Sequence, residues 1–292
     1  MGSTATSFLH NGTIGDVHGA LPVMKEYYKK TGKKVMLYLA KDVKAYYYEG
    51  AYHPTMDSTG VNVMLNQQVI DMMIPLYKAQ PYIEDCKVWN KEPIKIDLCK
   101  IRDTFVNMPY GDLRMWYPIV YPDLACDFLF FYIEVPELKE DFAKGKLIVS
   151  RSERYHNPQA NYRFLKPYEK KLLFVGNDLE YAIFTLRFGL NIDRLIINDF
   201  LELAQILNQS LGLLSNQTQI FQIAEAIKIP RTVELCSFAP NVIPMGKDGY
   251  YFYAQEALEY YVKLMLGETQ KPQINGVIEL PKSGSSSIIQ TT

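Results

Sequence analysis

Short apolar runs alternate with helical segments across the second half of this chain, and this alternation constrains the fold more than any other feature. Apolar runs suited to strands occupy residues 146–150, 171–176, 195–197, 211–215 and 232–235. Segments with helical spacing occupy residues 178–188, 199–209, 218–228 and 255–266. Strands and helices that alternate on so short a period are typical of a parallel sheet covered by helices. We therefore predict a parallel α/β domain.

The first half predicts a second domain of the same type. A short strand at 7–10 precedes a helix at 19–30, on which Leu21, Met24 and Tyr28 share one face, and the apolar run at 33–40 is the next strand. A further helix is expected at 63–79. Signals then weaken: the Tyr-rich stretch 45–54 reads as a loop or irregular strand, and strands are placed only loosely at 87–90, 94–98 and 127–135.

The length and composition fit two domains. A chain of 292 residues that is 48% hydrophobic can bury a large core. The charged segment before Gly145 marks the boundary, which gives an N-terminal Rossmann-like domain over 1–140 and a C-terminal one over 141–253. A last helix falls within 254–268, and the Ser-rich tail over 269–292 is expected to be partly disordered.

Bulk chemistry excludes several classes of protein. The formal charge of -1 and the pI of 6.4 give no signature of general nucleic-acid binding. The four cysteines contain no CxxC pair, so neither a zinc site nor a disulfide framework is indicated. No apolar run approaches the roughly 20 residues of a membrane span, and the N-terminus lacks a signal-peptide pattern. We expect a cytoplasmic protein without a transmembrane segment.

The turn after the first strand carries the first candidate site. Gly12, Thr13, Gly15 and Asp16 form a GxxGD pattern rather than GxGxxG, and Ala40 and Lys41 stand where a dinucleotide-binding chain would place an acid. A nicotinamide cofactor is therefore not expected, and the lysine of a phosphate-binding P-loop is absent. Asp16 at a helix N-terminus, with His18 two residues on, is either a helix cap or a general base.

The loop after the first strand of the second half is the next candidate. Arg151 and Arg154, with the hydroxyls of Ser152 and Tyr155, could clamp a diphosphate, because guanidinium groups bind phosphate oxygens in a bidentate way. The alternative is a solvated charged loop.

A polar turn opens the helix expected at 218–228. Free backbone N–H groups at such a turn can hold an anion, and the candidate ligands are Asn216, Gln217, Thr218, Gln219, Gln222 and Glu225. Gln222 and Glu225 are three residues apart and so share a face of the helix. Simple capping by Asn216 or Thr218 is the alternative.

Three stretches together resemble the heptosyltransferase-like inverting glycosyltransferases. GTIGDVHGALPVMKEYY resembles their opening loop, which reads roughly GxxGDxxxxxP, and LSNQTQIFQIAEAIKIP is similar to their signature of the type xGNDSGPMHLAAALGKP. IVSRSERYHNPQANYRFL stands where the family places its donor-phosphate loop. The resemblance implies a GT-B architecture of two Rossmann-like domains with parallel sheets facing across a cleft, and a last helix that packs back on the N-terminal domain.

The same resemblance implies the chemistry. Asp16 would be the catalytic base, aided by His18, and no metal or other cofactor would be needed. The nucleotide-sugar co-substrate would be held mainly by the second domain, with Gly12, Thr13 and Gly15 facing it from the first. The acceptor would be a glycan, a lipid-linked sugar or, for a phage-encoded member, a DNA base.

The chain also departs from the family pattern. Gln217, Gln219, Ile220 and Gln222 replace the usual Asp, Gly, Pro and His, and Arg151 and Arg154 stand in for the expected lysine. The chain therefore reads as a divergent member whose donor need not be ADP-heptose. Two rival functions stay open: a nucleotide-sugar epimerase or hydrolase on the same scaffold, and an inactive GT-B-like binding protein.

Overall fold

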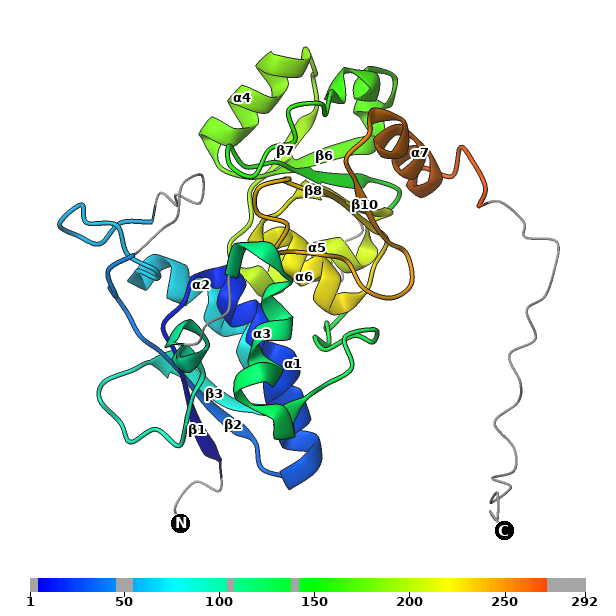
Figure 1. The fold of residues 1–292 in the computed structure, drawn as a ribbon. Coiled ribbons are helices and arrows are strands. Elements are labelled where there is room, and N and C mark those ends of the chain that lie inside the picture. Colours follow the sequence, from blue (N-terminus) through cyan, green and yellow to red (C-terminus); the bar gives the residue numbers. More distant parts are fainter. Residues whose placement is uncertain (1–4, 46–54, 104–107, 138–141, 272–292) are drawn as a thin grey trace, which may run out of the picture.

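The computed structural model describes residues 5–45, 55–103, 108–137 and 142–271, and it contains two parallel sheets (Figure 1). The predictions for the stretch 45–54 and for the end of the tail fall largely outside these residues. The N-terminal elements are β1 (Thr6–His10), α1 (Ile14–Thr31), β2 (Val35–Leu39), α2 (Gln67–Lys78), β3 (Ile83–Val88), β4 (Ile96–Asp97), the 3-10 helices η1 (Leu98–Asp103) and η2 (Met108–Tyr110), α3 (Leu113–Val120) and η3 (Pro122–Leu124). Their four strands run parallel in the order β3-β2-β1-β4.

The C-terminal sheet has the strand order of a dinucleotide-binding domain. Its elements are β5 (Leu147–Ser150), η4 (Tyr162–Lys171), β6 (Leu172–Val175), α4 (Asp178–Phe188), β7 (Asp193–Leu195), α5 (Phe200–Gln209), β8 (Gly212–Asn216), α6 (Gln219–Ile227), β9 (Arg231–Glu234), β10 (Gly249–Phe252) and α7 (Gln255–Met265). The six parallel strands lie in the order β10-β9-β8-β5-β6-β7, so the order reverses between β5 and β8. Ligands of open α/β sheets bind beyond the carboxyl ends of the strands at such a switch point.

The two faces of the C-terminal sheet are buried against different helices. Ile148 and Leu213 belong to a large core with Phe200 of α5 and Phe221 of α6. Their neighbours Leu147 and Leu214 point to the opposite face and a second core. Both faces are therefore covered, as the continuous apolar runs predicted.

Helices from the two domains pack directly on one another. α1 contacts α6, α2 contacts α5, and the large core continues from the N-terminal sheet into these C-terminal helices (Figure 1). The prediction of an α/β fold with two parallel sheets is confirmed. Helices α1 and α6 each begin at one of the turns that the sequence marks as candidate sites.

Three details of the prediction are wrong. α7 contacts β9 and β10 and buries Leu258 and Val262 in the second core of the C-terminal sheet, so it does not pack back on the N-terminal domain. Residues 127–135 form no strand; the N–H groups of Tyr132 and Ile133 instead donate to the Ala226 carbonyl of α6. Residues 89–90, expected to belong to a strand, lie beyond the end of β3.

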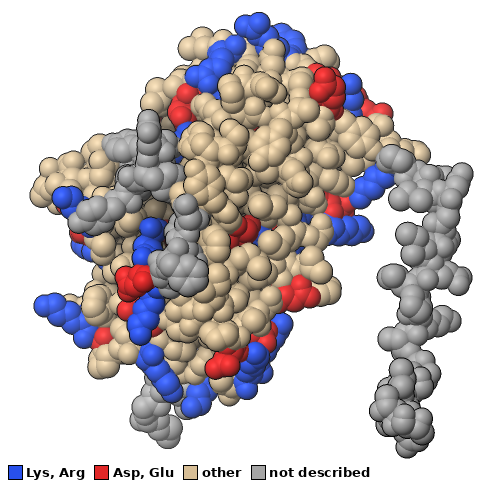
Figure 2. Space-filling model, viewed as in Figure 1, with Lys and Arg blue, Asp and Glu red and all other residues tan. Residues whose placement is uncertain are grey.

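The surface carries mixed charge. On the face drawn in Figure 2, Lys and Arg residues lie scattered near the margins among acidic ones, which agrees with the near-zero formal charge. No helix in the described ranges is long and apolar enough to cross a membrane.

Candidate active site

The loop between β1 and α1 holds Asp16 by its own backbone. Thr13 is the N-cap of α1, and its N–H and Oγ1 donate to Asp16 Oδ2 over 2.8 and 3.1 Å. Arg102 of η1 donates to the same oxygen and forms an ion pair with it. Asp16 is therefore a capping residue, as one of the two sequence interpretations had it, and it also carries a buried charge that Arg102 compensates.

The electrostatic surroundings keep Asp16 ionised. Burial raises the pKa of the carboxyl, but the Arg102 guanidinium and the hydrogen bond from Thr13 outweigh burial and hold the pKa below its usual range. An ionised carboxylate at a helix N-terminus is also favoured by the helix dipole. Asp16 can thus accept a proton at neutral pH.

His10 and Tyr117 hold the loop between β1 and α1 through hydrogen bonds to its backbone. The Gly12 N–H donates to His10 Nδ1 over 2.9 Å, so Nε2 carries the proton and donates to the Tyr117 hydroxyl at 2.7 Å. Tyr117 in turn donates to the Asp16 carbonyl at 2.7 Å. Burial lowers the pKa of His10 to about 4, which keeps the ring neutral and preserves this chain of hydrogen bonds.

Gly12 is required by this packing, whereas Gly15 is not. A Cβ on Gly12 would lie 2.5 Å from Asp16 Oδ2 and 2.7 Å from His10 Cε1. A Cβ on Gly15 would meet only Thr13 Oγ1, at 3.9 Å. The packing thus explains the first glycine and leaves the second open to a reason outside the fold, such as the approach of a ligand.

His18 lies away from this loop surface. Its side chain is fully buried, its Nδ1 hydrogen-bonds the Tyr77 hydroxyl at 2.9 Å, and its ring packs edge-on against Phe200 of the C-terminal domain. Burial lowers the pKa of His18 to about 3. Its Nε2 is buried and has no hydrogen-bond partner among the described residues. A neutral ring without exposed surface is not placed to exchange a proton with an acceptor, so the structure does not support the expected role of His18 beside Asp16.

The switch point of the C-terminal sheet is bridged by Asn216. This residue ends β8, is fully buried, and accepts the Ser152 N–H at 3.0 Å. Its Nδ2 donates to the carbonyls of Ser152 and Arg154. Asn216 therefore ties the loop after β5 to the turn after β8 and shapes both predicted donor loops.

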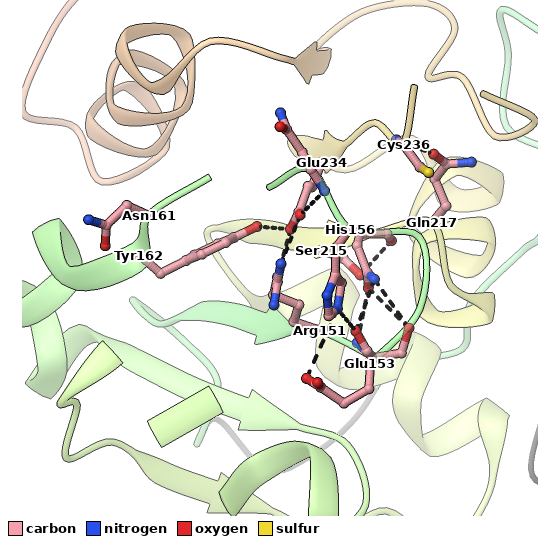
Figure 3. A network of polar contacts seen from close by, with 12 residues as sticks. Arg151, Glu153, His156, Asn161, Tyr162, Ser215, Gln217, Glu234 and Cys236 are labelled. Atoms are coloured by element: carbon pink, nitrogen blue, oxygen red, sulfur yellow. Dashed lines mark hydrogen bonds and ion pairs between the residues drawn. The ribbon is translucent and has the colours of Figure 1, made fainter. Parts of the chain in front are cut away.

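Arg151 is engaged within the protein. Its Nε and Nη2 donate to the two carboxylate oxygens of Glu234 over 2.7 and 2.9 Å, and the guanidinium lies over the ring of Tyr162 (Figure 3). Glu234 also accepts from the Asn157 N–H and the Tyr162 hydroxyl, both at 2.6 Å. The expectation that Arg151 clamps the donor diphosphate is corrected, because its bidentate face binds Glu234 and supports the loop after β5.

Arg154, the second arginine of this loop, is partly exposed, whereas Arg151 is buried. Arg154 places its guanidinium over the ring of Tyr155 at 5.7 Å, and its charge acts on Glu180 at the start of α4. Tyr155 itself has a positive φ of 55° and pairs with the half-exposed ring of Phe238. Of the two predicted phosphate ligands, Arg151 is held by its ion pair with Glu234, whereas Arg154 takes no part in that ion pair.

Two predicted ligands of the α6 turn hold neighbouring structure instead. Gln217 accepts the Cys236 N–H (Figure 3) and donates to the Ala239 carbonyl and Asn241 Oδ1. It therefore fixes the loop after β9. Thr218 is the N-cap position of α6 and its Oγ1 bonds Ser215 Oγ at 3.0 Å.

Glu225 is a buried ionic centre and not a cleft residue. Its carboxylate is fully buried and pairs with Arg114 of α3, Lys228 and Arg231. The expectation that Glu225 binds the donor is corrected, because three cations occupy its oxygens.

Two amides at the start of α6 stand apart from these networks. Gln222 is 1% exposed, and neither its Oε1 nor its Nε2 has a hydrogen-bond partner; Gln219 Oε1 is likewise buried without one. Buried polar atoms are nearly always hydrogen-bonded, so this pair one turn apart has donors and acceptors available for a bound molecule or an ordered water.

Four residues that hold the candidate site in place escaped the sequence reasoning: His10, Arg102, Tyr117 and Glu234. Each acts through a partner far away in sequence, and His10 alone had a local signal, since it ends a strand next to the glycine-rich turn.

Comparison with known proteins identifies the fold. No family model matches the sequence, and no curated protein does. Among solved structures, a glycosyl transferase of family 9 from Veillonella parvula superposes with a TM-score of 0.57 at 12% identity, covering 92% of this chain and 99% of that one. The E. coli heptosyltransferase WaaC with ADP gives 0.59 at 12% identity, covering 89% and 99%.

A third neighbour among the solved structures is described as containing iron. TibC from E. coli, described as an iron-containing dodecameric glycosyltransferase, gives a TM-score of 0.51 at 11% identity over 80% of this chain and 58% of its own. In the described ranges of our chain, no group of three or more His, Cys, Asp or Glu residues is placed to hold a metal ion.

The likenesses confirm the heptosyltransferase-like GT-B fold expected from the three sequence motifs.

Proposed function

We propose that this protein is a glycosyltransferase that moves a sugar from a nucleotide-sugar donor to an acceptor hydroxyl, with inversion and without a metal ion. The observation that carries the proposal is the pair of unpartnered amides, Gln219 and Gln222, at the start of α6 beside the switch point of the C-terminal sheet. A nucleoside diphosphate bound there would supply the missing partners.

The donor diphosphate would bind at the N-terminus of α6. The free N–H groups of this helical turn attract anions, and the turn follows β8 at the centre of the sheet. Arg154 would add a charge from the loop after β5. Charge stabilisation of the departing diphosphate is the term that a metal supplies in other transferases, and positioned donors of this kind are usually a large part of catalysis.

The acceptor would be deprotonated by Asp16. The carboxylate is ionised and sits at the start of α1, and α1 packs on α6. The two loops that bear the proposed chemistry thus belong to helices in mutual contact.

A two-stage experiment tests the proposal. Thermal shifts with UDP, GDP, ADP, CMP and dTDP sugars find the donor, and Gln222→Leu should abolish that shift while leaving the melting temperature of the free protein unchanged or higher. Release of the nucleotide, which is CMP from a CMP-sugar and a nucleoside diphosphate from the other donors, is then measured with and without glycan, lipid-linked and DNA acceptors. The anomeric configuration of the product, read by NMR, decides inversion, and activity in EDTA decides the metal question.

The outcomes separate this proposal from its rivals. Release that needs an acceptor and is lost in Asp16→Asn supports transfer. Release without any acceptor would indicate a hydrolase or epimerase, and binding without release from any donor would indicate a non-catalytic protein.

A further inference from the structure

Arg102 approaches Asp16 from an element that the sequence motifs do not include. Arg102 lies on η1, which directly follows β4, the strand that pairs with β1. Its side chain is 34% exposed, whereas that of Asp16 is 5% exposed. A partly exposed cation thus covers an almost buried carboxylate at the loop where the acceptor is expected.

The hydrogen bonds to Asp16 divide its two oxygens. Thr13 N, Thr13 Oγ1 and Arg102 Nη2 all donate to Oδ2. Within the described part of the chain, no side chain or backbone N–H is seen to donate to Oδ1. Oδ2 therefore accepts from three donors, whereas Oδ1 accepts from none of the described residues.

We propose that Arg102 is a positioning residue that fixes Asp16 through Oδ2, so that Oδ1 receives the proton of the acceptor hydroxyl. The inference rests on the proposed function. In the step, the acceptor O–H bond breaks and the proton goes to Oδ1. The hydroxyl oxygen bonds to the anomeric carbon as the bond from that carbon to the diphosphate oxygen breaks, and the electron pair of that bond leaves with the nucleoside diphosphate.

The other charges near Asp16 do not substitute for Arg102. His10 of β1 is neutral and both of its nitrogens are hydrogen-bonded. Tyr117 of α3 donates to the backbone carbonyl of Asp16 rather than to its carboxylate. Asp97 and Cys99, which lie at the end of β4 and just after it, act on His10 and Arg102 respectively. Arg102 is thus the cation that holds this carboxylate charged.

A positioning role predicts a shift in titration as well as a loss of rate. Burial alone would raise the pKa of Asp16, and Arg102 is the first influence that opposes burial. An opposite charge in contact lowers the pKa of a carboxyl, so removal of Arg102 should move the Asp16 titration upward.

The experiment compares three variants of the full chain. Arg102→Gln removes the charge, Arg102→Lys keeps it without the fork, and Lys100→Gln is the matched control, because it removes a cation from an exposed position of the same 3-10 helix. The Asp16 carboxyl is followed by carbon-13 NMR, with its signal assigned through Asp16→Asn. The acid limb of kcat/KM against pH is measured in parallel.

Arg102→Gln should shift both the NMR midpoint and the acid limb upward, Lys100→Gln should shift neither, and Arg102→Lys should restore most of the wild-type midpoint. An unchanged midpoint in Arg102→Gln, or an equal shift in Lys100→Gln, would overturn the inference. A shifted midpoint with an unmoved acid limb would also overturn it. If Arg102→Gln does not fold, the wild-type midpoint of Asp16 decides: a midpoint below the ordinary carboxyl range supports the inference, and one at or above that range overturns it. Should no donor support transfer at all, the proposed function fails, and the NMR titration still decides whether Arg102 governs Asp16.

Discussion

Loss of one partner from the buried ionic cluster around Glu225 should lower the free energy of unfolding strongly. Glu225 Oε1 accepts from Arg114 Nη1 at 2.5 Å and from Lys228 and the Met245 N–H, and Oε2 accepts from Arg231. Glu225→Gln would leave the fully buried Arg231 without a carboxylate and turn an amide N–H toward a donor. Removing one partner of a buried pair costs about 3 to 5 kcal/mol, a large share of a typical total of about 5 to 15 kcal/mol.

Urea unfolding of wild type and variant measures this loss. Glu84→Gln is the control, because the Glu84 and Lys34 side chains are 50% and 44% exposed and such surface pairs contribute at most about 1 kcal/mol. A loss below about 1 kcal/mol in Glu225→Gln would refute the structural role. If Glu225 bound the donor instead, the substitution would spare the free protein and weaken only the stabilisation that the donor provides.

Two further substitutions separate folding from function, and a third tests a buried histidine. Gly12→Ala should destabilise by about 1 to 3 kcal/mol, because its methyl group would overlap Asp16 and His10. Gly15→Ala should keep or raise the melting temperature, since Ala favours a helix by up to about 1 kcal/mol, and a loss of turnover in this stable variant would show that a ligand approaches there. His18→Gln tests the burial of a neutral ring. The pKa of His18 is about 3 in the folded protein, against an ordinary value of 6.5. Below pH 6.5 the unfolded chain therefore binds a proton on His18 that the folded protein does not bind, so the free energy of unfolding falls as the pH drops. That fall, followed by urea unfolding between about pH 4.5 and 6, should be shallower in the variant by up to about 1.4 kcal/mol per pH unit, and an equal slope would contradict the assignment.

The strand and helix pattern could be predicted where the sequence itself carries a period. The helix predicted over 178–188 coincides with α4, because Asn177 and Glu180 form a capping box and Gly189 ends the helix. β10 was missed although its residues Tyr250 to Phe252 form an aromatic run, which is typical of a strand. α3 was missed because Pro118 lies inside it and its eight residues are too few for a clear period.

The site was only partly predictable, because the same side chain can hold a ligand or hold the protein. Arg151 and Glu225 have the chemistry of donor ligands, and what they bind depends on Glu234 and Arg114, which are 83 and 111 residues away in sequence. A sequence shows which groups are present at a turn. It does not show which side chains from distant parts of the chain lie close enough to bind those groups in the folded protein.

The departures from the family pattern can be read in the same physical terms. At position 217 an amide donates two hydrogen bonds, to Ala239 and Asn241, and accepts one from Cys236. A carboxylate can only accept, so restoring the aspartate of the family at this position would break two contacts and bury an unpaired charge. Gln222 differs, since its amide has no partner among the described residues of the protein. The first replacement therefore belongs to the scaffold of the loop after β9, and the second is the place where this chain would adapt to its own donor.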